Sequence, residues 1–334
     1  MLCAAVVWEI IARAGIASIV WLRYDPALGH VHSAGSTVIT DEGFARSTYD
    51  KNGYRGGLPA SRPKMMVLAL GDSLTEAAQV PDSDTFCWLA TELFKAKGVD
   101  AFVADAGLAG GSPARYVAVA PWYESHLHPD RVIVQLDEGD FVADLPNQTG
   151  DFVIRPFGDG FKLEPAPHRV GIFERLDSSH LPPLAKSAVK SFAPTSLLQL
   201  ALNAATGAPQ DAAAPASAAV DVKRTTYVPY VRWSVQELKR AYKDPILLFL
   251  PDVDYFDIGK PESSEEAELR AECNTHGVTL INMRNTFIDT FKRTGQCASG
   301  FANTQPGEGH MNILGHRLVA QALVSLIALG GSTR

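Results

Sequence analysis

Short apolar runs recur from residue 65 onward, and stretches with helical periodicity alternate with them. We predict strands at 65–70, 101–105, 131–136, 246–250 and 279–282, and helices at 84–97, 113–126 and 312–329. Ser83 or Asp84 is the expected N-cap of the first helix. Alternation of this kind predicts an α/β fold, a three-layer α/β/α sandwich with a central, mostly parallel five-stranded sheet.

Two segments depart from this rhythm. Residues 23–62 are dense in turn formers, so we predict an irregular lead-in with one or two short strands. Residues 145–235 form the second departure, with a helix candidate at 196–205 and an Ala/Pro-rich tract at 207–219. We interpret them as an insertion at the carboxyl edge of the sheet, within a main domain that spans 63–334.

The N-terminal stretch is apolar over residues 2–22 but carries Glu9 and Arg13. Its length suits a bilayer crossing, although each buried charge costs about 2.5–3.5 kcal/mol. An amphipathic helix packed on the body is the alternative. We predict a membrane anchor within residues 1–22 and an extracytoplasmic location, periplasmic or membrane-anchored.

Composition narrows the possible partners. The 334 residues are 46% hydrophobic and 20% charged, as in ordinary globular proteins. The net charge of -7 and the lack of a basic cluster argue against nucleic acid as a partner. Four scattered cysteines without a C-x-x-C pair argue against a cysteine-based zinc site. A Cys273–Cys297 disulfide and buried free thiols both remain open.

The first predicted strand ends in Gly71-Asp72-Ser73-Leu74, and a helical stretch follows. A parallel strand delivers such a serine to the carboxyl edge of the sheet, where open α/β folds bind ligands. His310 lies near the other end of the chain, just before the last predicted helix. A serine and a histidine so far apart in sequence can still meet as nucleophile and base.

These pieces resemble the GDSL, or SGNH, hydrolases, in their exported or membrane-anchored bacterial form. Gly71-Asp72-Ser73-Leu74 is similar to the first block of that family. Residues 105–107 lie where its second block has a glycine, 136–141 where its third block has Gly-x-Asn-Asp, and 307–310 where its last block has Asp-x-x-His. The resemblance covers residue 65 to the C-terminus apart from the insertion, and it implies a flavodoxin-like fold.

The resemblance also implies roles for particular residues. Ser73 would be the nucleophile and His310 its general base. The backbone N–H groups of Ser73 and Gly107 would hold the oxyanion, and a glycine suits that close approach. Asp72 would support the turn. The family uses neither a metal nor an organic cofactor, so none is expected here.

Two positions depart from the family pattern. The third-block asparagine, a side-chain donor to the oxyanion, is replaced by Gly139, which offers only its backbone N–H. Losing one such donor costs about 10²–10³ in kcat. The acid that orients the histidine is replaced by Gly307. Glu308 is the nearest carboxylate, and a backbone carbonyl of the 303–308 loop is the alternative.

Each of these residues also has a structural interpretation. Ser73 is good helix-capping chemistry, and Glu308 is an ordinary solvated loop residue. Because Ser73 and His310 both occur in the sequence context that the family gives them, we predict a serine ester hydrolase. It would form an acyl-enzyme on Ser73 and act on a small-molecule or glycan ester. An O-acyltransferase acting on a glycan and an SGNH-fold binding protein with a decayed site are the alternatives.

Overall fold

A computed structural model describes the chain except for residues 1–21, 40–41, 144–150, 159, 167–215 and 331–334. The anchor predicted at 1–22 lies outside this part but for Leu22. The helix candidate at 196–205 and most of the Ala/Pro-rich tract also lie outside it. Among the described residues, no helix has the length and apolarity needed to cross a bilayer.

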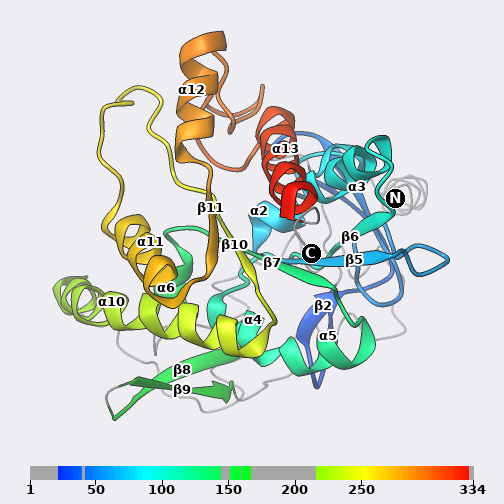
Figure 1. Cartoon of the computed structure of the whole chain (residues 1–334). Helices are drawn as coiled ribbons and strands as arrows, with labels where there is room; N and C mark the ends of the chain where they lie inside the picture. The colour runs from blue at the N-terminus through cyan, green and yellow to red at the C-terminus, as the bar shows by residue number, and fades with distance from the viewer. Residues whose placement is uncertain (1–21, 40–41, 144–150, 159, 167–215, 331–334) are drawn as a thin grey trace, which may run out of the picture.

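The centre of the fold is the predicted α/β sheet (Figure 1). Its strands are β5 (Met65–Leu70), β6 (Ala101–Asp105), β7 (Arg131–Leu136), β10 (Ile246–Phe249) and β11 (Thr279–Asn282). They pair in parallel in the order β11-β10-β7-β5-β6. Read from the other edge, this is the flavodoxin-like order. The chain adds β6 on one side of β5 and then adds β7, β10 and β11 on the other side, so the topological switch point lies between β5 and β7. The five-stranded parallel sheet is therefore confirmed.

Helices cover both faces of the sheet. They are α2 (Ser73–Glu76), α3 (Phe86–Ala96), α4 (Pro113–Ala118), α5 (Ala120–His126), α6 (Asp140–Ala143), α10 (Ala216–Ala241), α11 (Ser264–His276), α12 (Arg284–Thr294) and α13 (Ile313–Gly330), with a 3₁₀ turn η1 at Asp82–Asp84. In Figure 1, α3, α12 and α13 lie on one side of the sheet, and α4, α5 and α10 on the other. The three-layer prediction is confirmed.

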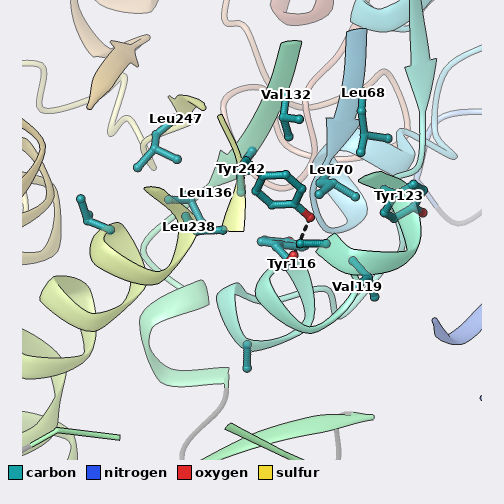
Figure 2. Packing of buried hydrophobic residues seen from close by; sticks show 14 of the residues in the cluster. Leu68, Leu70, Tyr116, Val119, Tyr123, Val132, Leu136, Leu238, Tyr242 and Leu247 are labelled. Carbon is teal, nitrogen blue, oxygen red and sulfur yellow. Dashed lines mark hydrogen bonds between the residues drawn. The ribbon is translucent and has the colours of Figure 1, made fainter. Parts of the chain in front are cut away.

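The core is divided by the sheet, because successive strand residues point to opposite faces. Leu68 and Leu70 of β5 join a cluster with α4, α5 and α10. Val67 and Ala69 join a second cluster with α3 and α13. Figure 2 shows the first cluster, in which the Tyr242 hydroxyl donates to a backbone oxygen of α4 at 2.6 Å.

Some element boundaries differ from the prediction. The cap of α3 is Thr85, whose hydroxyl accepts from the Trp88 N–H at 3.2 Å, and neither Ser83 nor Asp84 takes that place. The helix predicted at 113–126 is two helices that meet at Val119. Pro121 explains the break, because it has no N–H to bond and its ring crowds the preceding turn.

The lead-in is more regular than predicted. It contains two antiparallel hairpins, β1 (Leu22–Asp25) with β2 (Gly29–His32) and β3 (Gly35–Ile39) with β4 (Ala45–Tyr49). Within the insertion, β8 (Phe152–Phe157) and β9 (Gly160–Pro165) form a third hairpin. Cys273 and Cys297 are free thiols, so the disulfide is not formed.

Candidate active site

Ser73 lies at the carboxyl edge of the sheet, at the reversal point between β5 and β7. It is the first residue of α2, which starts directly after β5. Asp72 is the N-cap, and its carboxylate accepts from the Leu74 N–H at 2.8 Å. Asp72 therefore shapes the turn, as expected. Burial, and then the charge of Asp137, raise the pKa of Asp72.

His310 reaches Ser73 from the loop before α13. Its Nε2 lies 2.9 Å from the Ser73 Oγ, although 237 positions separate the two residues in sequence. A hydrogen bond from Gly300 N–H to the His310 carbonyl, 3.0 Å long, helps hold this loop. The structure thus brings together the predicted nucleophile and the predicted base.

The second ring nitrogen of His310 contacts Glu42, a residue that the sequence patterns did not predict for this site. The His310 Nδ1 lies 2.5 Å from Glu42 Oε2, and the His310 backbone N–H donates to Glu42 Oε1 at 2.7 Å. The Glu42 carboxylate therefore contacts the backbone nitrogen of His310 with one oxygen and its ring Nδ1 with the other. With the proton on Nδ1, Nε2 is left to accept from the Ser73 hydroxyl.

Glu308 does not take the place predicted for it. It is exposed on the loop, and its backbone N–H bonds to Gln305 O at 3.2 Å. Glu42 comes instead from the lead-in, between β3 and β4, 268 positions before His310. The only signal in the sequence is an acidic pair before a glycine at 41–43, which is common in turns.

The predicted oxyanion donors differ in their availability. No described residue accepts from the backbone N–H of Ser73, as is usual at the first position of a helix. The Gly107 N–H donates to Asp105 Oδ1 at 3.0 Å. The Gly139 N–H donates to Asp137 Oδ1 at 2.5 Å. Of the three predicted donors, Ser73 alone has its N–H uncommitted.

Gly107 packs closely against α2. A Cβ at this position would lie 2.2 Å from the Glu76 N, so only glycine fits against α2. Gly139 is different, because it is exposed and a Cβ there would meet only the Asp137 carboxylate. Gly107 is thus required for packing, whereas Gly139 has no comparable constraint.

Three carboxylates gather at the ends of β5 and β7. Oxygens of Asp72, Asp137 and Asp140 lie within 4.8 Å of one another. They are the group among the described residues whose spacing suits a cation. Asp140 Oδ2 accepts from the Asp137 N–H at 2.9 Å, so local turn formation accounts for much of this arrangement. We assign no ion to it.

A cavity of about 690 Å³ is lined by residues of the 295–302 segment, of the segment after α2 and of the start of α13. Its lining is mostly apolar and includes Phe44, Phe301 and Ile313. The described residues that form its wall do not include Ser73 or His310.

Comparison with known proteins gives distant structural similarity. No protein-family model matches the chain, and no curated protein matches it. Among solved structures, the chain is similar to the psychrotrophic esterase EstA from Pseudoalteromonas sp. (TM-score 0.40, 10% identity, 80% of this chain and 99% of that one). It is also similar to the acetyl xylan esterase Axe2 from Geobacillus stearothermophilus (0.41, 13%, 79% and 94%) and to a two-domain esterase active on acetylated mannans (0.43, 13%, 79% and 49%). Matches this distant leave the reaction to be argued from the site.

Proposed function

We propose that this protein is a serine ester hydrolase whose catalytic residues are Ser73, His310 and Glu42. The observation that carries the proposal is the continuous contact from the Ser73 Oγ through both ring nitrogens of His310 to Glu42. This is the arrangement that nucleophilic acyl transfer needs, since a hydroxyl is a weak nucleophile until a positioned base removes its proton.

The reaction proceeds in two steps. His310 Nε2 takes the Ser73 proton as Oγ attacks the ester carbonyl carbon, and the same nitrogen then protonates the leaving alkoxide. Water, deprotonated by His310, attacks the acyl-enzyme, and His310 returns that proton to the Ser73 Oγ as the acid leaves. Glu42 fixes the tautomer of His310 and stabilises the imidazolium formed in each step. The Ser73 N–H, at the start of α2, faces the developing oxyanion.

The test measures hydrolysis of p-nitrophenyl acetate. Ser73→Ala and His310→Ala are each expected to reduce kcat by about 10³-fold or more while circular dichroism stays unchanged. Glu42→Gln is expected to reduce kcat by about 10²–10⁴-fold, because the imidazole loses its orienting acceptor. A fluorophosphonate should label the native protein at Ser73 and leave Ser73→Ala unlabelled.

The matched control is Glu308→Gln, which makes the same change two positions from His310 on an exposed side chain. Its rate should equal that of the native protein. A Ser73→Ala variant that keeps the full rate would contradict the proposal. Absence of a fluorophosphonate adduct would instead favour the binding protein with a decayed site.

A further inference from the structure

Glu42 needs support, because it does not belong to a strand or helix of the described chain. It lies in the connection between β3 and β4, outside the central sheet. Its carboxylate must nevertheless stay within hydrogen-bond distance of His310 Nδ1. A displacement of about 1 Å in such a contact can cost about 10²-fold in rate.

The support comes from the next residue along the chain and from the His310 loop. The Gly43 N–H donates to Asn303 Oδ1 at 2.9 Å, and Asn303 Nδ2 donates to the Gly43 carbonyl at 3.2 Å. One carboxamide therefore holds both polar groups of the Gly43 backbone. Asn303 lies in a turn closed by the Phe301 and Thr304 backbones, seven positions before His310.

Packing also confines the backbone of Gly43. Its φ is +70°, and a Cβ there would lie 2.6 Å from the Gln79 carbonyl and 3.1 Å from the Phe301 ring. The backbone at Gly43 is thus enclosed between the segment after α2 and the His310 loop. Packing alone does not fix the orientation of the peptide groups on either side of Gly43. The two hydrogen bonds with Asn303 do fix it, because they are directional.

We propose that Asn303 is a positioning residue for the proposed reaction, holding Gly43 so that the Glu42 carboxylate stays on His310. This inference rests on the proposed function. Asparagine suits the role because it offers one donor and one acceptor side by side, as the two groups of Gly43 require. Aspartate could accept from the Gly43 N–H but would oppose its carbonyl with negative charge.

The test is a double-mutant cycle on ester hydrolysis with Asn303→Ala and Glu42→Gln. Asn303→Ala alone is expected to lower kcat by about 10–10²-fold with little change in KM. In the Glu42→Gln background the same change should cost little, because the carboxylate that it positions is gone. Asn303→Asp should fall between the native protein and Asn303→Ala, and Asn52→Ala, on an exposed turn of the same lead-in, should be neutral.

A second readout does not depend on turnover. In ¹H NMR, the proton that His310 Nδ1 shares with Glu42 should give a downfield resonance in the native protein and in Asn52→Ala. Asn303→Ala should broaden or shift this resonance while the melting temperature confirms a folded protein. Native kcat and an unchanged resonance in Asn303→Ala would overturn the inference, and so would an equal loss of kcat in both backgrounds. If the native protein hydrolysed no ester, the proposed function would fail while the resonance still tested Asn303.

Discussion

Gly309 shows how little space surrounds the Glu42 carboxylate. Its φ is +75°, and a Cβ there would lie 2.3 Å from Glu42 Oε1. A side chain at this position would therefore meet the acid itself, in a backbone conformation that already disfavours one. The residue just before the proposed base is thus constrained by the residue that orients that base.

Gly309→Ala is accordingly expected to separate activity from stability. The free energy of unfolding should fall by about 1–3 kcal/mol, because alanine is strained in the left-handed backbone conformation. The loss of kcat should be much larger than in the control variant. The control is Gly295→Ala, where φ is +70° but no atom lies within 4 Å of the added Cβ. Urea denaturation and ester hydrolysis measure the two effects. Equal kcat in both variants would contradict this account of Gly309.

Sequence patterns could predict two of the three proposed catalytic residues. Ser73 follows an apolar strand and His310 precedes an amphipathic helix, so each is marked by its local context. Glu42 has no such context, because its partner lies 268 positions away and its neighbours form an ordinary turn. Proximity in sequence therefore points to Glu308, whereas the carboxylate that lies beside His310 in space is that of Glu42.

The elements of the central sheet could be predicted because each buried parallel strand is a continuous apolar run. The lead-in hairpins could not. β4 alternates between buried and exposed residues over only five positions, and β1 is half-buried throughout, so neither produces a strong period. Short strands like these are set by what they pack against, which the chain does not reveal locally.

The packing of α13 on α3 contains a buried histidine with a pH consequence. His316 Nδ1 accepts from the Phe86 N–H at 3.3 Å, and the side chain is 1% exposed. Burial, with smaller electrostatic contributions from Arg55 and His310, lowers the pKa of His316 to about 3. The folded protein therefore holds this imidazole neutral where the unfolded chain, with a pKa near 6.5, takes up a proton.

The contribution of His316 to stability is complete above pH 6.5 and is lost as the pH falls from 6.5 toward 3. The slope for one group is about 1.4 kcal/mol per pH unit. In His316→Gln, whose amide oxygen can still accept from Phe86, this slope should disappear. Urea denaturation at pH 7, 6, 5 and 4 measures the difference between the two proteins. Parallel curves across this range would contradict the assignment.

Arg55 joins the lead-in to the α/β body through several hydrogen bonds. The residue is 5% exposed, and its guanidinium donates to Asp82 Oδ1 at 2.9 Å, to Val80 O at 2.6 Å and to Glu76 O. Its acceptors belong to α2, to the connection that follows it and to η1. The lead-in, which carries Glu42, is thereby fixed to the same short helix that begins with Ser73.

Arg55→Met is therefore expected to lower the free energy of global unfolding, and not only the stability of one segment. It leaves the Asp82 carboxylate and two backbone carbonyls without this donor, and breaking a buried charge pair costs about 3–5 kcal/mol. Arg55→Lys should recover part of the lost stability, because lysine keeps the positive charge but lacks the planar set of N–H donors of the guanidinium. Lys95→Met, at a side chain that is 76% exposed and pairs with Glu92, should change stability by less than about 1 kcal/mol.

Hydrogen exchange distinguishes whether the lead-in is integral to the fold or merely attached to it. If it is integral, amides of β4 and β5 should lose protection together in Arg55→Met, in proportion to the loss in the free energy of unfolding. Ester hydrolysis should then fall with the folded fraction, since Glu42, Ser73 and His310 are held by one cooperative unit. Faster exchange confined to β3 and β4, with β5 as protected as in the native protein, would instead show that the acid is carried by a segment that opens alone.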